Sequence, residues 1–285
     1  MRRTKGSEVP VTRDEPGTPK AHPRKYDVEV AVFDRMTTEH RRILLPFEEY
    51  VAVYRKMGLS PWLESQPADS PVLEVGCWDG IHLFNLAQIT KRPGIGIDIS
   101  KASLDPAAQE ARRTGLPVTF AAMDALRMGF PDGAFRTIFF FNALHHFFSQ
   151  GFDEVLAEVR RVLHPQGRLF LGEVSLLYPY HCLAFVGARV IKKFARLDCI
   201  ERNFTDNEMG LWPGLVRRRA RRVGLEVVAG SVGFFSYVTR HAVPPDDKTP
   251  KLFRAVARTC ALLGYLGPQP WKHDCLHMAL ERRKE

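Results

Sequence analysis

Two adjacent histidines, His145 and His146, stand shortly after an apolar run that ends at Phe141. Imidazole exchanges protons near neutral pH better than any other side chain, so this position could supply a general base. If the segment is a loop that enters a helix, adjacent residues face different ways and only one histidine reaches a reacting group. We prefer His145. The competing interpretation for each is an ordinary packing role with satisfied hydrogen bonds.

Glycines and acids form a second group of candidate residues. Gly76 and Gly80 lie between a short apolar run, 72–75, and a segment whose apolar residues recur at helical spacing. A strand, a tight turn and a helix bring backbone N–H groups and the positive end of the helix to one point, which suits the polar end of a cofactor. Asp98 ends the next apolar run, where a carboxylate suits ribose hydroxyls. The pattern predicts a site for an adenosine-containing cofactor.

The glycine spacing argues against a dinucleotide. Such a site needs Gly-x-Gly-x-x-Gly, whose second glycine admits the pyrophosphate. In this chain Gly76 is followed by Cys77, Trp78, Asp79 and Gly80, so Trp78 stands where a middle glycine would be. A non-catalytic protein that keeps the fold is therefore an alternative interpretation, because an indole at this place could fill cofactor space.

The elements that must position these residues alternate between strand and helix patterns. Helices are expected at 37–58, with Pro46 as a kink, from 81 onward and at 152–163. Strands are expected at 72–75, 94–98, 118–122, 137–141 and 168–173. The alternation predicts an α/β fold with a doubly wound sheet, whose ligands bind at the carboxyl ends of the strands.

The stretch 72–87 resembles the first motif of class I S-adenosylmethionine-dependent methyltransferases, usually Glu/Asp-x-Gly-x-Gly-x-Gly, with Glu74, Gly76 and Gly80 in register. Further motifs extend the resemblance to the type 11, small-molecule group over residues 72–173. They are Asp98, the Met123-Asp124-Ala125 step, the run 130–135, Leu144-His145-His146 and the run 158–167. In this order and spacing they identify the chain as a member of that group. The region beyond resembles only the general ending of the family, which implies a helix at 212–224 and strands at 225–229 and 272–281.

The resemblance implies the fold in full: an α/β, Rossmann-like doubly wound sheet, mostly parallel with an antiparallel last strand, with helices on both faces. It also implies S-adenosyl-L-methionine as the cofactor. Glu74, Gly76 and Gly80 would cradle the methionine end, and Asp98 would take both ribose hydroxyls. The other implied cofactor residues are Ile99, then Asp124 and Ala125 along the adenine, and Asn142 at the methionine part.

Methyl transfer from a sulfonium is an in-line displacement, so the alignment of acceptor, methyl group and sulfur supplies most of the catalysis. An acceptor hydroxyl must also lose a proton. The predicted reaction is therefore O-methylation of a small molecule, with His145 or His146 as the base. No metal is expected, because His273, Cys275 and His277 would lie on one face of one strand, an awkward geometry for a single ion.

The net charge of +9 raises the question of anionic partners. Much of the excess lies in the first residues and in the arginines of 217–222, for which a disordered tail and a solvated helix face are the plain interpretation. Nucleic acid is not the expected partner, because 141–144 does not resemble the Asn/Asp-Pro-Pro-Tyr/Phe motif of amino-methylating enzymes of that kind.

A membrane-associated lipid or quinone is an alternative acceptor. The apolar stretch 174–191 beside Lys192, Lys193 and Arg196 would then make a peripheral membrane contact.

The domain organisation follows from composition. Residues 1–25 hold several Pro and Gly and almost nothing apolar, so we expect a disordered basic tail. Residues 26–70 are expected to form an N-terminal helical lid, and 71–285 the methyltransferase domain with cap insertions at about 174–211 and 233–271. The five cysteines are scattered without metal-finger spacing, and no signal-peptide pattern is visible, which favours a cytoplasmic protein with free thiols.

Overall fold

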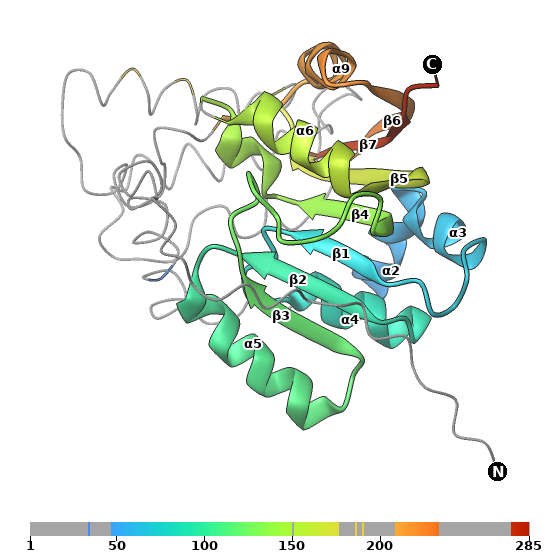
Figure 1. Ribbon diagram of the computed structural model, residues 1–285, viewed down its shortest axis with the longest axis vertical. Helices are drawn as coiled ribbons and strands as arrows, with labels where there is room; N and C mark the ends of the chain where they lie inside the picture. Colours follow the sequence, from blue (N-terminus) through green and yellow to red (C-terminus); the bar gives the residue numbers. More distant parts are fainter. Residues whose placement is uncertain are drawn as a thin grey trace, which may run out of the picture.

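The computed structural model describes residues 47–149, 151–176, 209–233 and 275–284, together with Asp34, Val186 and Val190. In these residues one sheet has the strand order β3-β2-β1-β4-β5-β7-β6 (Figure 1). Strand β7 is antiparallel to its neighbours β5 and β6, and the other pairs are parallel. The strands are β1 (Val72–Val75), β2 (Gly94–Asp98), β3 (Val118–Ala122), β4 (Phe135–Phe141), β5 (Leu163–Val174), β6 (Leu225–Gly233) and β7 (Cys275–Arg282). The predicted fold class is confirmed.

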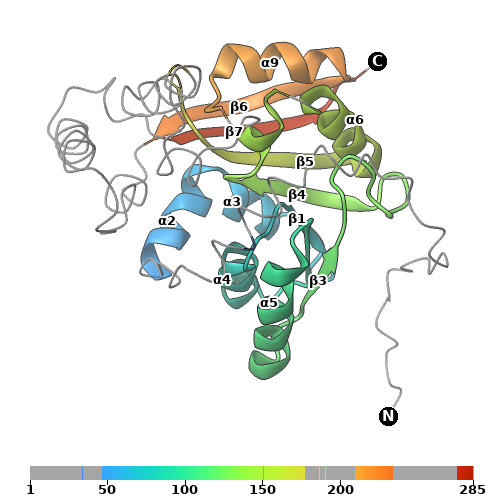
Figure 2. The same ribbon diagram turned by 90° about the vertical axis from the view of Figure 1, so that its left-hand side faces the viewer.

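Helices cover both faces of the sheet, because side chains on the strands alternate between two apolar clusters (Figure 2). In β4, Ile138 and Phe140 face the cluster that holds α6 and α9, while Phe139 and Phe141 face the cluster that holds α2 to α5. None of the described helices is long and apolar enough to cross a membrane. The helices are α2 (Phe47–Lys56), α3 (Leu59–Glu64), α4 (Ile81–Thr90), α5 (Lys101–Thr114), the 3-10 helix η1 (Leu144–Phe147), α6 (Phe152–Val162) and α9 (Pro213–Arg222).

Element bounds differ from expectation mainly in β5. The strand begins at Leu163, directly after α6, rather than at Arg168. Leu163 pairs with Phe135, and the register then shifts before Thr137 pairs with Arg168. A register shift of this kind lets Pro165 and Gly167 lie inside the strand, although their types predict an interruption.

The turn after β1 lies where the strand order reverses, between β2 and β4. Gly76 and Gly80 both have positive φ, 71° and 74°. A Cβ on Gly76 would lie 2.5 Å from the Cβ of Ala143, in the loop after β4. Only glycine can combine that backbone conformation with so close an approach. The loops after β1 and β4 are therefore in direct contact.

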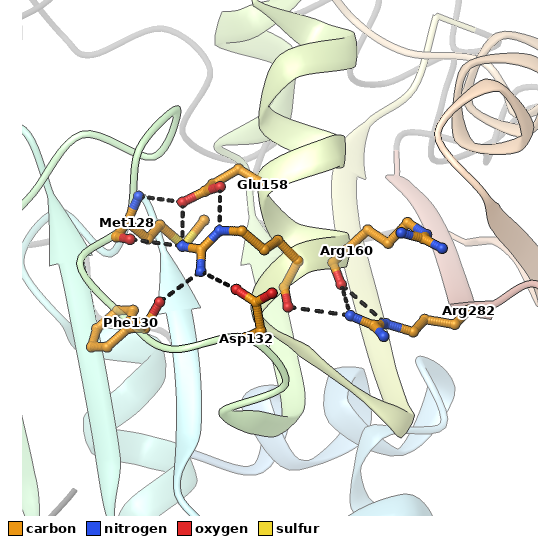
Figure 3. A network of polar contacts seen from close by, with 7 residues as sticks. Met128, Phe130, Asp132, Glu158, Arg160 and Arg282 are labelled. Carbon is orange, nitrogen blue, oxygen red and sulfur yellow. Dashed lines mark hydrogen bonds and ion pairs between the residues drawn. The ribbon is translucent and has the colours of Figure 1, made fainter. Parts of the chain in front are cut away.

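The crossover from β3 to β4 is tied to α6 by Arg161. Its guanidinium donates to the carbonyl oxygens of Met128 and Phe130, each at 2.8 Å, and to the carboxylates of Asp132 and Glu158 (Figure 3). Glu158 in turn accepts from the backbone N–H of Met128 at 2.6 Å. We call this group the Arg161 clamp. It holds the crossover in place because each of these groups is satisfied by another member.

The N-terminal helices α2 and α3 pack on the sheet beside α4. Tyr54 of α2 is buried, and its hydroxyl donates to the carbonyl oxygen of His82 in α4 at 3.0 Å. The tail predicted at 1–25 lies outside the described residues. So do most of 26–46 and the parts of the two predicted insertions at 177–208 and 234–271, apart from Asp34, Val186 and Val190.

Candidate functional site

The carboxyl ends of five neighbouring parallel strands bring polar residues to one edge of the sheet. β1 is followed by Gly76, β2 ends at Asp98, β3 is followed by Asp124, β4 is followed by Asn142, and β5 carries Glu173 as its last residue but one. This edge contains the predicted cofactor residues and both predicted histidines. Open α/β sheets bind their ligands at such an edge, where the strand order reverses.

Glu74, inside β1, is 1% exposed, and neither of its carboxylate oxygens accepts a hydrogen bond from the described residues. Burial raises the pKa of this carboxyl well above its ordinary value, and the nearby carboxylates of Asp79 and Asp98 add to the rise. A buried carboxylate of this kind is suited to an ionic contact with an amino group of a ligand.

Asn142 offers a second buried acceptor, in the loop after β4. Its φ is 51°, a left-handed conformation that asparagine adopts more readily than most residues. Its backbone N–H donates to the carbonyl oxygen of Gly172 at 2.8 Å, which sets the direction of the loop. Its side-chain oxygen is buried and has no hydrogen-bond partner in the described part of the chain. Glu74 and Asn142 therefore both suit a donor group on a ligand.

Asp98 is oriented by the backbone around it. One oxygen accepts from the N–H of Trp78 at 2.8 Å and the other from the N–H of Ser100 at 2.9 Å. Burial raises the pKa of Asp98, and these backbone hydrogen bonds offset part of the rise. A carboxylate offers about four lone-pair sites, so Asp98 keeps acceptor capacity for a ligand hydroxyl beside these backbone donors. Ile99, which follows, is 39% exposed and offers an apolar surface beside the acid.

Trp78 has a φ of 45°, a conformation that costs a bulky residue about 1–2 kcal/mol. Strain of this kind collects where a binding site needs a particular backbone course. Here that course points the N–H of Trp78 at the carboxylate of Asp98. Trp78 thus keeps the turn that a middle glycine would make.

The end of β3 lies beside the end of β2, because the N–H of Met123 donates to the carbonyl oxygen of Asp98 at 2.9 Å. Asp124 is exposed, and its carboxylate accepts from the N–H of Leu126 at 2.8 Å, which caps a short turn. Ala125, inside that turn, is buried. The predicted adenine residues therefore lie next to the predicted ribose acid.

His145 is held by Glu173, which is fully buried near the end of β5. One oxygen of Glu173 accepts from the backbone N–H groups of Ala143 and Leu144, at 3.1 and 2.8 Å. The other lies 2.8 Å from Nδ1 of His145. A carboxylate at Nδ1 selects the tautomer with a proton there, so Nε2 becomes the nitrogen that can accept a proton. An imidazole held in this way can act as a proton acceptor.

The two histidines differ in their surroundings. His145 is only 4% exposed, while His146 is half-buried, and their rings are tilted by 36° with centroids 4.1 Å apart. His82, in α4, is a third histidine near this edge. It stacks on Phe141 at 3.8 Å, and burial lowers its pKa to about 3, so it is neutral near pH 7. His82 therefore packs in the core rather than exchanging protons.

Glu173 was not predicted as a site residue. The sequence shows only an acid at the end of the fifth strand, and nothing local links it to a histidine 28 positions earlier. The link follows from the pairing of β4 with β5, which places Phe141 opposite Gly172. The sequence did offer one indication of this contact. Glu173 is an acid near the end of the predicted fifth strand, and parallel strands bring their carboxyl ends, including the end of β4 before His145, to the same edge.

An apolar cluster adjoins the histidines. Val174 and Met209 are buried and pack with the half-buried Phe148 and Leu176. The backbone N–H of Met209 donates to the carbonyl oxygen of His145 at 3.2 Å, so the cluster borders the histidine loop directly. We call these four residues the apolar cluster.

Within the described residues no group of three His, Cys, Asp or Glu side chains is placed to hold a metal ion. His273 and the side chain of Cys275, two of the three residues considered for such a site, lie outside the described part.

Comparisons with known proteins agree with this geometry. A family model described as a methyltransferase domain matches residues 72–167. The chain is similar to the 27-O-demethylrifamycin SV methyltransferase of Amycolatopsis mediterranei, with 30% identity over 112 residues, which are 39% of this chain and 40% of that protein. It is also similar to the demethylmenaquinone methyltransferase of Thermus thermophilus, with 32% identity over 155 residues, which are 50% of this chain and 68% of that protein.

The matched part is the catalytic core rather than the whole chain. The chain spans about two fifths of the length of the first two curated relatives. A solved structure of a SAM-dependent methyltransferase from Methanosarcina mazei has a TM-score of 0.56 and 19% identity, and covers 78% of this chain and 96% of that chain. This last likeness concerns the fold.

Proposed function

The chain belongs to the type 11 group of class I S-adenosylmethionine-dependent methyltransferases, and from that premise we propose that it methylates a hydroxyl of a small molecule with His145 as the general base. The observation that carries the proposal is the contact between Glu173 and Nδ1 of His145 at the edge that also carries the cofactor acids.

The cofactor of this family is S-adenosylmethionine, and the residues at the strand ends fit it. Glu74 and the side-chain oxygen of Asn142 are buried acceptors suited to the methionine amino group. Gly76 and Gly80 shape the turn that would face its carboxylate, at the N-terminus of α4. Asp98 would accept the ribose hydroxyls. The adenine would lie along Ile99, Asp124 and Ala125, which follow β2 and β3.

The bound cofactor supplies a methyl group on a positively charged sulfur, and the chain's own residues supply the proton acceptor. His145 would take the acceptor's proton at Nε2, while Glu173 holds Nδ1–H and stabilises the imidazolium that results. The low exposure of His145 excludes water from this step. Glu173 is thus a positioning residue and His145 the catalytic one. His146, whose ring contacts that of His145, is the alternative base.

We also propose that the segments around this edge enclose the acceptor. The backbone N–H of Leu211 donates to the carbonyl oxygen of Val174 at 2.9 Å, and that of Leu176 donates to the carbonyl oxygen of Leu211 at 2.8 Å. The described residues on either side of 177–208 therefore lie next to each other, close to His145. A cap at about 174–211 fits that anchoring, and a second at 233–271 would complete it. Asp34 accepts from the hydroxyl of Ser100 at 2.5 Å, beside the ribose acid, which fits a lid formed by 26–70.

A cytoplasmic location is part of the proposal and suits the buried free thiol of Cys77.

A second candidate acceptor is a lipid-soluble ring of the quinone type. It is favoured by the similarity to a demethylmenaquinone methyltransferase and by the apolar cluster next to His145. In that case the methyl group would go to carbon or oxygen of an apolar ring, and the apolar cluster would contact the ring or its side chain.

The test is transfer of tritiated methyl groups from S-adenosylmethionine to a panel of hydroxylated acceptors that includes simple phenols, alcohols and menadiol. We expect methylated oxygen in the product. His145→Gln should lower kcat by about 10²–10⁴-fold while the cofactor still binds. Glu173→Gln should lower kcat less and shift the pH dependence of kcat, because the imidazolium loses its carboxylate.

His164→Gln is the matched control, since His164 lies at the start of β5, away from this edge, and should leave kcat unchanged. Loss of turnover in His146→Gln with normal turnover in His145→Gln would assign the base to His146. A product methylated only on ring carbon would favour the quinone-type acceptor.

A further inference from the structure

Helix α9 presents a purely basic face to solvent. Its buried side, Leu215, Val216 and Ala220, packs on the sheet. The opposite side carries Arg217, Arg218, Arg221 and Arg222, all exposed, at the spacing that places side chains on one face of a helix. We call these four residues the arginine face.

These cations are poorly neutralised. Arg219, which is half-buried, forms the ion pair with Asp153 at 2.8 Å, and Arg222 lies 3.7 Å from the same carboxylate. Arg217, Arg218 and Arg221 have no ion-pair partner in the part of the chain that the structure describes. A face built only for solubility would mix charges of both signs.

The chain's C-terminal strand adds to the same charge. The backbone N–H of Arg283 donates to the carbonyl oxygen of Gly224 at 2.9 Å, just beyond the end of α9. Arg283 and Lys284 are both exposed there. Exposed Glu226, on the adjoining β6, is the acid nearest in sequence to the arginine face, and Glu281, in β7, is paired with Arg168. The net charge of this surface is therefore strongly positive.

The arginine face is also placed in a particular relation to the site. Helix α9 lies outermost, over β6 and β7, in both views (Figures 1 and 2). It begins after Trp212, which is 37% exposed and follows Leu211, the residue paired with Ser175 at the end of β5. The ring of Trp212 lies 6.4 Å from that of Phe148, a member of the apolar cluster. The helix thus starts at the edge that holds the histidines.

We infer that the arginine face docks this protein on an anionic lipid bilayer. Basic side chains near such a surface each strengthen binding about fivefold, and a tryptophan at the end of the basic helix suits the headgroup region. RNA fits less well, because the arginine face itself carries no aromatic residue on which bases could stack, and Trp212 lies more than a turn away at the start of α9. Docking would bring the histidine edge close to the membrane surface. The inference goes beyond the proposed function and does not depend on it.

The test is flotation of the full chain with vesicles of phosphatidylcholine alone or with about 30% phosphatidylglycerol. The test variant is R217Q/R218Q/R221Q/R222Q. The charge-matched control is K91Q/K101Q/R112Q/R113Q, which removes four exposed cations from α5 and the end of α4. Circular dichroism and melting curves establish that both variants fold.

We expect binding to the anionic vesicles only, with a partition coefficient that falls on the order of a hundredfold in the test variant and less than about threefold in the control. Raising the salt concentration should abolish binding. Equal binding of the two variants, or equal binding to uncharged vesicles, would overturn the inference. So would a failure to float combined with a gel-mobility shift of RNA that depends on the arginine face, since the partner would then be nucleic acid.

Discussion

A carboxyl group that is buried and accepts no hydrogen bond, as that of Glu74 is within the described residues, lowers the stability of the fold around it. At the scale of single residues, the proposed site contains several features that lower the stability of the fold. Trp78 and Asn142 have positive φ angles, and Asp98 is a half-buried acid whose pKa is raised by its burial. Binding sites tolerate such destabilising features because interactions with a bound ligand offset them.

Glu74→Gln tests this trade. The pKa of Glu74 is raised in the folded state, so the protonated side chain favours folding at pH values below the ordinary pKa of 4.5. This stabilisation is lost as the pH rises through the raised pKa of the folded state. The variant should therefore gain in free energy of unfolding relative to the native chain between about pH 5 and pH 8, while its affinity for S-adenosylmethionine falls about tenfold or more. Urea unfolding and calorimetry measure the two quantities. Exposed Glu64→Gln is the control and should change neither; a native-like affinity in Glu74→Gln would remove Glu74 from the site.

Gly76→Ala and Gly115→Ala form a matched pair. Both glycines have positive φ, 71° and 63°, but only a Cβ on Gly76 meets a neighbour, Ala143 at 2.5 Å, while Gly115 has nothing within 4 Å. We expect Gly115→Ala to cost about 1 kcal/mol and Gly76→Ala about 3 kcal/mol, because the second adds overpacking to backbone strain. Denaturant midpoints at constant slope give both numbers. Equal costs would mean that the loops after β1 and β4 are not in contact.

At the scale of elements, the Arg161 clamp fixes the crossover that follows the adenine residues. Burial raises the pKa of Glu158, but the hydrogen bonds from Arg161 and from the N–H of Met128 outweigh it, so the pKa lies below its ordinary value. The clamp therefore stabilises the fold above the ordinary pKa of 4.5, and this contribution is lost as the pH falls through the lowered value.

Glu158→Gln should accordingly lose about 1–2 kcal/mol of unfolding free energy at pH 7 and progressively less as the pH falls toward 3. Glu154→Gln, an exposed acid in the first turn of the same helix, should change stability by less than about 0.5 kcal/mol at either pH. Urea unfolding at pH 7 and pH 3.5 distinguishes the two. A pH-independent loss in Glu158→Gln would show that its ionised form has no role in the clamp.

Element patterns explain which parts of the fold were predictable. The strands β1, β2 and β4 could be predicted from short apolar runs that end at Gly76, Asp98 and Asn142. Parallel strands are buried on both faces, so an uninterrupted apolar run is the sequence pattern that they produce. The early start of β5 was missed, since it depends on the register shift opposite Phe135, which is set by the partner strand.

At the scale of the whole molecule, the site depends on contacts between strands that are far apart in the chain. The shared edge of Asp98 and Asp124 could be predicted, because one ends β2, the other follows β3, and parallel strands end at one edge of a sheet. The pairing of Glu173 with His145 could not, because it depends on β4 and β5 being neighbours and on a ring orientation that only packing decides. The positive φ of Trp78 was likewise invisible, since its residue type argues against that conformation.

The cofactor site is the central claim, and calorimetric titration of the full chain with S-adenosylmethionine and S-adenosylhomocysteine tests it most directly. We predict dissociation constants in the micromolar range, and for Asp98→Ala an affinity about a hundredfold lower with the melting curve little changed. The Trp78 turn would then be compatible with a working methyl-donor site. A folded native chain that binds neither compound at millimolar concentration, or an Asp98→Ala variant with native affinity, would contradict the assignment.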